Sequence, residues 1–243
     1  MSETSQPLII AHRGARRVAP ENSLPAITRA AELGADRVEI DVRLTKDGVP
    51  VVLHDATVQR TTDGVGRIGD LTWHQARKLR LRVRKGKEAP ADMRLPTLES
   101  ALDAARTADM PLVVELKSPE HQPELVTKTL KLLKEAGMTG ETWIWSFNWR
   151  DLRAVHELAP RIARGTLSMR WPRPEGLANA EMVVPFAGHQ LLVRGTPPDI
   201  GARPVIIWTV NQPWMARRFA ERGVAGLITD VPDRLRALFP RET

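Results

Sequence analysis

The alternation of short β-branched runs with helix-like stretches most limits how this chain can fold. Some of the runs are apolar without alternation, as expected of strands that are covered on both faces. This repetition predicts a mostly parallel sheet with helices packed against it. The runs are LIIA (8–11), VEIDV (38–42), VPVVL (49–53), LVVEL (112–116), TWIWS (142–146), RGTL (164–167), MVVP (182–185), VIIWT (205–209) and GLIT (226–229).

Helical patterns separate many of these runs, and two regions depart from the regular order. Residues 56–96 are too long for an ordinary connection, so we expect a small insertion or capping lobe there. Residues 188–204 contain several Pro and Gly, which predicts a short or missing helix before VIIWT. We expect residues 1–243 to form one domain, with helices at 24–33, 97–108, 123–136, 149–158 and 212–222.

Length and composition narrow the class of protein. The 243 residues can bury a large core as one α/β domain or two small ones. The 36 Lys and Arg against 29 Asp and Glu give a net charge of +7, which favours an anionic partner without choosing its type. Cysteine is absent, which excludes disulfides and thiolate chemistry. With no signal-peptide pattern and no long apolar run, we expect a cytoplasmic protein without integral membrane contact.

Polar residues that could act in catalysis or ligand binding fall at the ends of the predicted strands. A single polar residue there would mean little, but in a closed β/α barrel all these ends meet on one face, where active sites of that fold lie. The residues are His12, Arg13, Glu39, Asp41, His54, Asp55, Glu115, Lys117, Ser146, Phe147, Asn211, Thr229 and Asp230.

Three of these residues suggest a metal site. Glu39, Asp41 and Glu115 come from neighbouring strands, and clustered carboxylates repel one another unless protons or a cation neutralise them. Oxygen ligands favour a hard divalent ion, so we expect one Mg²⁺ or Ca²⁺. Arg13 and Lys117 bring positive charge suited to phosphate oxygens. A simpler alternative is that Glu115 only pairs with Lys117.

Two histidines complete the predicted chemistry. His12 and His54 have imidazoles whose ordinary pKa suits a general base and a general acid. A divalent ion, two cations and two imidazoles around a barrel mouth indicate cleavage of a phosphate ester. No GxSxG elbow is present, and acyl or glycosidic chemistry fits this set poorly.

A series of short motifs also occurs in a fixed order along nearly the whole chain. In that order and spacing they resemble the motifs of the glycerophosphodiester phosphodiesterase family, with Ser23 where the family pattern has Thr. The motifs are HRG (12–14), ENS (21–23), EID (39–41), TKDG (45–48), HD (54–55), RTT (60–62), LPTLE (95–99), ELK (115–117), SF (146–147), WTVN (208–211) and ITD (228–230).

The resemblance implies a TIM-type (β/α)8 barrel with a small insertion after the third strand. It implies a metal-dependent hydrolase that converts glycerophosphodiesters, such as glycerophosphocholine and glycerophosphoethanolamine, to glycerol 3-phosphate and an alcohol. The implied roles are metal binding by Glu39, Asp41 and Glu115, acid-base catalysis by His12 and His54, and phosphate binding by Arg13 and Lys117. We also expect Trp208 and Asn211 to bind substrate, and Glu21, Asn22 and Phe147 to lie at the rim.

Some choices stay open from sequence. The attacking oxygen is either that of a water or the 2-hydroxyl of the glycerol. An alternative activity is that of a lysophospholipase D on lysophospholipids, and a further alternative is a non-catalytic protein that binds anionic ligands.

The basic run RKLRLRVRKGK (77–87) is either a solvated face or a weak contact with an anionic membrane surface. We expect no nucleic-acid partner because no aromatic-basic motif is present. The oligomeric state is open.

Overall fold

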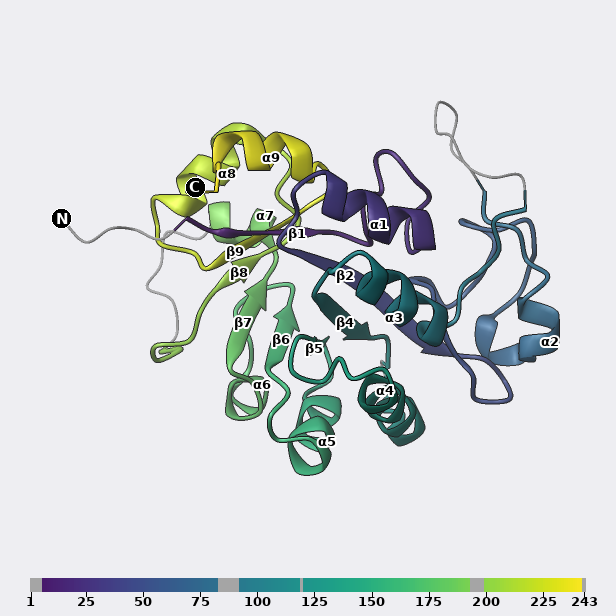
Figure 1. Ribbon diagram of the computed structural model, residues 1–243. Helices are drawn as coiled ribbons and strands as arrows, with labels where there is room; N and C mark the ends of the chain where they lie inside the picture. Colours follow the sequence, from purple (N-terminus) through teal and green to yellow (C-terminus); the bar gives the residue numbers. More distant parts are fainter. Residues whose placement is uncertain (1–5, 83–91, 119, 193–198, 242–243) are drawn as a thin grey trace.

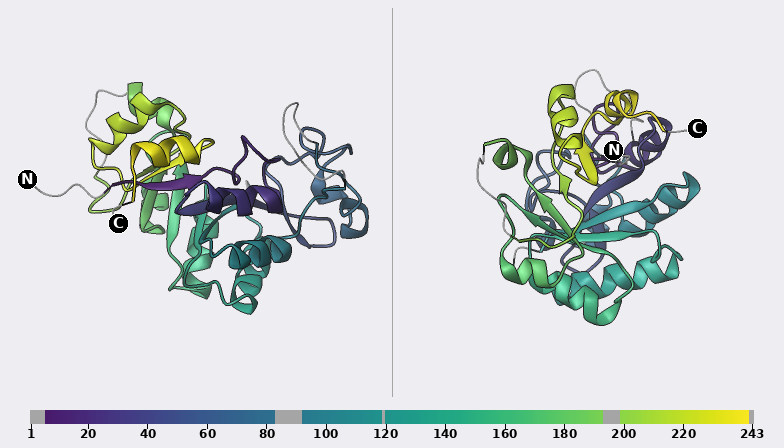
Figure 2. Two further views of the ribbon diagram at one scale, coloured as in Figure 1. Left: turned by 45° about the horizontal axis from the view of Figure 1, so that its top comes forward. Right: turned by 90° about the vertical axis from the view of Figure 1, so that its left-hand side faces the viewer.

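The computed structural model describes residues 6–82, 92–118, 120–192 and 199–241. Within these residues, eight parallel strands form a nearly closed barrel in the order β7-β6-β5-β4-β2-β1-β9-β8 (Figures 1 and 2). Single bridges between Val183 and Val205 and between Phe186 and Trp208 join its two ends. The predicted barrel is confirmed. The strands are β1 (Leu8–Ala11), β2 (Arg37–Leu44), β4 (Leu112–Leu116), β5 (Trp143–Ser146), β6 (Arg164–Ser168), β7 (Met182–Pro185), β8 (Ile206–Ile207) and β9 (Gly226–Thr229).

Helices follow the strands and surround the barrel (Figure 2). Their starts carry ordinary capping signals, because the side chains of Ser23, Thr97 and Asn148 accept hydrogen bonds from the first turns of α1, α3 and α5. The helices are α1 (Leu24–Glu32), α3 (Leu98–Thr107), α4 (Pro123–Glu135), α5 (Trp149–Leu158), α6 (Pro174–Ala178), α7 (Ala187–Leu192), α8 (Pro213–Ala220) and α9 (Pro232–Leu238). None of the described helices is long and apolar enough to cross a membrane.

Some elements differ from their predicted extent. The strand predicted at 205–209 is reduced to β8, because beyond Ile207 the chain pairs with β7 only through the bridge at Trp208. α6 and α9 were not predicted. Both are short helices with proline in the first turn, and their sequences are too brief to show a helical period. In the segment 188–204, where a short or missing helix is predicted, α7 reaches Leu192, and residues 193–198 lie outside the described residues.

The two-residue period of β2 decides which side chains face the barrel interior. Val38, Ile40 and Val42 pack outward in the core shared with the covering helices. Glu39 and Asp41 therefore point into the barrel. Below them the interior is filled by an apolar layer, which closes the barrel under its mouth. That layer contains Ile10, Val113, Trp145, Leu167, Met182, Val184, Ile206 and Ile228.

β3 (Pro50–Val52) pairs antiparallel with β2 after the turn at Asp47 and Gly48, and the chain then enters the insertion. It continues through a 3-10 turn, Ile68–Asp70, and α2 (Trp73–Ala76), and in Figure 1 it lies on the side away from both termini. A small apolar cluster of its own supports it, including Val58, Ile68, Ala76, Leu81 and Leu95. Arg77, Lys78, Arg80 and Arg82 of the basic run are exposed, whereas residues 83–87 lie outside the described residues.

Candidate active site

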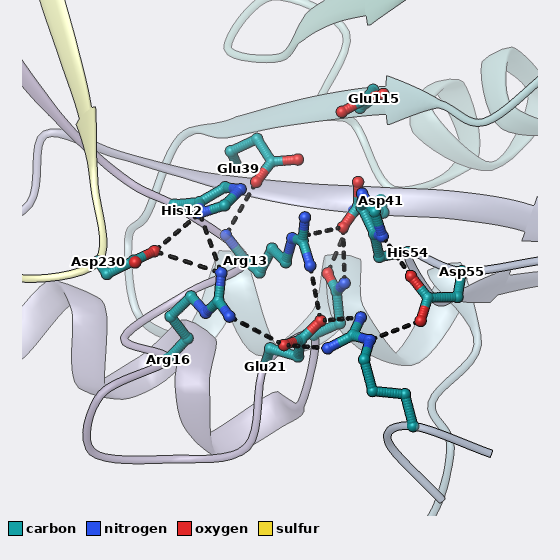
Figure 3. Close-up of polar contacts among 12 residues, drawn as sticks. His12, Arg13, Arg16, Glu21, Glu39, Asp41, His54, Asp55, Glu115 and Asp230 are labelled. Atoms are coloured by element: carbon teal, nitrogen blue, oxygen red, sulfur yellow. Dashed lines mark hydrogen bonds and ion pairs between the residues drawn. The ribbon is translucent and has the colours of Figure 1, made fainter. Parts of the chain in front are cut away.

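The pairing of β1 with β9 fixes the position of the first imidazole, that of His12. Ala11 lies opposite Thr229, so the next residues, His12 and Asp230, emerge side by side at the mouth. The Nδ1 atom of His12 lies 2.8 Å from Asp230 Oδ1 (Figure 3). Asn211 holds this carboxylate, because its Nδ2 donates to Asp230 Oδ2 at 2.9 Å and its Oδ1 accepts from Asp230 N at 2.8 Å. A proton on Nδ1 leaves Nε2 as the reactive nitrogen of His12.

The HRG motif forms a tight turn after β1. Arg13 and Gly14 have φ of 55° and 77°, and the turn lets Arg13 N donate to Glu39 Oε2 at 2.8 Å. A Cβ on Gly14 would lie 2.6 Å from Ala26 Cβ in α1, so only glycine fits there. The turn therefore joins the first strand, the first helix and the first carboxylate.

The three predicted carboxylates come together as expected. β2 and β4 pair with Asp41 directly opposite Glu115, and Glu39 lies two residues earlier on the same face. One ligand atom from each lies within 4.8 Å of the other two, and the residues are 3%, 1% and 8% exposed for Glu39, Asp41 and Glu115. Burial and the neighbouring Asp41 and Glu115 raise the pKa of Glu39 well above its ordinary value. Burial also raises the pKa of Glu115.

Two cations offset part of this charge. Lys117 Nζ lies 2.6 Å from Glu115 Oε1 and 3.1 Å from Asp41 Oδ1, and Arg13 Nε lies 3.3 Å from Asp41 Oδ2. Burial disfavours the charged form of Asp41, but Lys117 and Arg13 hold the pKa of this carboxyl well below its ordinary value. Glu115 thus pairs with Lys117, and it also belongs to the acidic cluster.

The residues nevertheless fit a divalent cation. Glu39 Oε1 is buried and has no hydrogen-bond partner among the described residues. An unpaired carboxylate oxygen in the interior is costly unless a proton or cation binds it. Three carboxylates without sulfur or imidazole ligands favour a hard ion such as Mg²⁺ or Ca²⁺.

The hairpin of β2 and β3 returns the second imidazole to the same mouth. Leu53 N donates to Asp41 O at 2.9 Å, which places His54 beside the carboxylates. His54 Nδ1 lies 2.6 Å from Asp55 Oδ1, and Arg43 Nε donates to His54 O at 2.8 Å. Burial lowers the pKa of His54, against the attraction of Asp41. Burial likewise lowers the pKa of His12, against its hydrogen bond to Asp230.

Both imidazoles and two of the three clustered carboxylates, Glu39 and Glu115, open into one cavity of about 150 Å³. One side is charged and the other is apolar. On the apolar side, Phe147 is 47% exposed and lies edge-on to Trp208, with ring centroids 5.8 Å apart. The lining residues are His12, Arg13, Glu39, His54, Glu115, Lys117, Trp145, Phe147, Leu167, Trp208 and Ile228.

Four of the predicted site residues do not line the cavity. Asp41, Glu21, Asn22 and Asn211 are not among its lining residues in the described chain. The Nδ2 atom of Asn22 donates to Asp41 Oδ2 at 2.8 Å, and its Oδ1 accepts from Asp41 N at 3.1 Å. Asn22 thereby orients a carboxylate of the cluster, as Asn211 orients Asp230.

Four charged residues around the site were given no role from sequence, although Asp55 and Asp230 were expected at the strand ends. Asp230 and Asp55 each hold an imidazole Nδ1, and Arg16 and Arg60 surround Glu21. The position of Asp230 at the end of β9 was a usable signal. Its pairing with His12 follows only once β9 is known to neighbour β1.

Comparison with known proteins gives a consistent result. Residues 12–234 match the model of the Glycerophosphoryl diester phosphodiesterase family. A glycerophosphodiester phosphodiesterase of Caldanaerobacter subterraneus subsp. tengcongensis is 37% identical over 94% of this chain and 96% of its own length. A phosphodiesterase of Oleispira antarctica, solved in complex with the product sn-glycerol-3-phosphate, superposes with a TM-score of 0.83 at 26% identity, covering 97% of this chain and 98% of its own. A putative glycerophosphoryl diester phosphodiesterase from Silicibacter pomeroyi superposes with a TM-score of 0.82 at 27% identity. The match covers 96% of this chain and 93% of the other.

Proposed function

This chain belongs to the glycerophosphoryl diester phosphodiesterase family, and we propose that it hydrolyses small glycerophosphodiesters to glycerol 3-phosphate and an alcohol. One observation carries the proposal. Two imidazoles, each bound at Nδ1 by a carboxylate, open into the same cavity as Glu39 and Glu115, which belong to a buried cluster of three carboxylates with Asp41. Glycerophosphocholine and glycerophosphoethanolamine are the substrates we infer.

The two imidazoles provide the proton transfers. Hydrolysis of a diester needs a base for the attacking oxygen and an acid for the leaving alcohol. His12 and His54 meet this need through Nε2, since Asp230 and Asp55 bind their Nδ1 atoms. The same pair serves whether the attacking oxygen belongs to a water or to the glycerol 2-hydroxyl.

The acidic cluster is proposed as the site of one divalent ion, Mg²⁺ or Ca²⁺, held by Glu39, Asp41 and Glu115. When bound, such an ion lowers the pKa of an attacking hydroxyl and offsets charge on the phosphoryl oxygens. Arg13 and Lys117 line the same cavity and bring cationic donors to the phosphate.

The apolar side of the cavity is proposed as the place of the leaving alcohol, with Trp208 and Phe147 as its walls. The cavity volume of about 150 Å³ is smaller than the roughly 300–1,000 Å³ of typical small-molecule pockets. A long acyl chain would therefore have to leave over the rim, which favours small diesters over lysophospholipids. The relative from Oleispira antarctica, solved with sn-glycerol-3-phosphate, supports the glycerol phosphate half.

We further propose that residues 1–243 act as one catalytic domain, with residues 56–96 as a lobe beside the mouth. Its own apolar cluster and its ion pairs to Glu21 support this assignment.

The test is a product assay on the purified chain. Glycerophosphocholine and a lysophospholipid are supplied with Mg²⁺, Ca²⁺ or EDTA, and glycerol phosphate, lysophosphatidate and choline are measured. We expect glycerol phosphate from the first substrate and little product from the second. Preferential release of lysophosphatidate would favour the lysophospholipase D activity instead, and no product from either substrate would overturn the proposal.

A further inference from the structure

The two imidazoles are joined by an unbroken series of charged contacts behind the cavity. Beyond each histidine lies its carboxylate, and two arginines connect these carboxylates through one shared glutamate (Figure 3). We call this series the arginine–carboxylate chain; its members are Asp55, Arg60, Glu21, Arg16 and Asp230.

Arg60 is the member that comes from the insertion. Its Nε donates to Asp55 Oδ2 at 2.5 Å, while Nη1 and Nη2 donate to the two oxygens of Glu21 at 2.8 Å each. One guanidinium thus binds the carboxylate that holds His54 and a carboxylate that is also bound by Arg13. The contact fixes the lobe against the loop before α1.

The other half of the chain runs from Glu21 to His12. Arg16 lies with Nη2 at 3.3 Å from Glu21 Oε2 and Nη1 at 3.5 Å from Asp230 Oδ1. These contacts are longer than those of Arg60, so the link to His54 is the tighter of the two.

Building on the proposed function, we propose that Arg60 is a positioning residue. Through Asp55 it fixes the ring orientation and tautomer of His54, and through Glu21 it anchors the lobe to the mouth. It acts on the reaction through these carboxylates, and it is absent from the cavity lining. Removal of the outer partners that orient metal ligands changes activity by roughly 10- to 100-fold, and we expect a loss of similar size for the partner that orients His54.

The planar guanidinium is needed because it serves two carboxylates at once. A lysine ammonium is a compact charge without the rigid fork of a guanidinium, so it cannot bind both oxygens of Glu21 in parallel while it also holds Asp55. Arg60→Lys should therefore retain part of the function that Arg60→Met loses.

The test compares Arg60→Met, Arg60→Lys and, as a control in the same lobe, Arg77→Met, which changes an exposed arginine. With glycerophosphocholine and Mg²⁺, we expect kcat to fall about 10- to 100-fold in Arg60→Met with a smaller change in KM. Arg60→Lys should lie between, and Arg77→Met should match the wild type. Circular dichroism checks folding, and if Arg60→Met does not fold, Arg60→Lys decides.

A second readout needs no substrate. In protein labelled with ¹⁵N-histidine, with the His54 signals assigned by His54→Gln, the wild type should show the tautomer protonated at Nδ1. Arg60→Met should shift these signals toward a mixture of tautomers. Unchanged His54 signals, or a kcat within twofold of the wild type, would overturn the proposal. If the wild type hydrolyses no diester at all, the proposed function fails while the tautomer result still decides the role of Arg60.

Discussion

At the scale of single residues, the site depends on which imidazole nitrogen faces the substrate. Asp230 and Asp55 bind Nδ1 of the two histidines, so both rings present the same nitrogen to one cavity. Burial lowers the pKa of each ring, which keeps a neutral base available near neutral pH.

Replacing His12 should therefore abolish most turnover. His12→Ala removes a group that transfers a proton, and such groups contribute roughly 10²- to 10⁴-fold. Steady-state hydrolysis of glycerophosphocholine measures the loss, with the thermal unfolding midpoint as the check on folding. Turnover close to the wild type in a folded variant would remove His12 from the mechanism.

The exposed ring of Phe147 should affect binding rather than chemistry. Phe147→Ala removes an aromatic wall worth about 0.5–1.5 kcal/mol, so KM for glycerophosphocholine should rise about 2- to 12-fold with kcat retained. Leu158→Ala is the matched control, since Leu158 is 59% exposed but lies at the end of α5, away from the mouth. Equal kinetics for the two variants would place the alcohol elsewhere.

At the scale of elements, the strand ends and the turns after them determine where the side chains of the site lie. The period of β2 follows from sequence, because apolar residues alternate with carboxylates along it. The register that sets Asp41 opposite Glu115 of β4 was not predicted. The turn after β1 depends on close packing with α1, which no local pattern reveals.

Gly14→Ala tests that packing. The variant incurs the left-handed strain of about 1 kcal/mol and also an overlap with Ala26 that costs about 1–3 kcal/mol more. Gly137→Ala is the control, since Gly137 has φ of 71° but nothing within 4 Å of an added Cβ. Urea unfolding should show the larger loss for Gly14→Ala. Equal losses would mean that the turn can move away from the helix.

At the scale of the whole molecule, Glu21 joins the barrel to its insertion. Its ion pairs should make the free energy of unfolding depend on pH in the acid range. Although burial disfavours its charge, hydrogen bonds from Arg60 and the charge of Arg13 lower the pKa of Glu21 to about 2. Its ordinary value is 4.5, so between these pH values the unfolded state binds more protons. The stabilisation is fully present above about pH 4.5 and is lost as the pH falls toward 2.

Glu21→Gln should remove this dependence. The variant should lose on the order of 3 kcal/mol of unfolding free energy near pH 7 and approach the wild type near pH 2. Denaturant unfolding at several pH values measures the effect, with the exposed Glu221→Gln as control. A constant difference between variant and wild type across this range would show that the charge of Glu21 is not the cause.

The sequence predicts the barrel and most of the cavity, but not the charged surroundings. His12, Glu39 and Glu115 could be placed because parallel strands bring their carboxyl ends to one face. Arg60 could not be placed, since its contacts with Glu21 and Asp55 depend on how the insertion packs against the loop before α1. The short helices α6 and α9 were missed for lack of a readable period.

The central claim is that Glu39, Asp41 and Glu115 bind a divalent ion that hydrolysis requires. It is tested most directly by adding a metal back to metal-free protein. The chain is freed of metal with EDTA, and hydrolysis of glycerophosphocholine is followed as Mg²⁺ or Ca²⁺ is added to the wild type and to Glu39→Gln. We predict almost no hydrolysis without metal, saturable recovery in the wild type, and recovery in Glu39→Gln only at a much higher concentration, if at all. Full hydrolysis by the stripped wild type, or identical metal curves for both proteins, would contradict the claim.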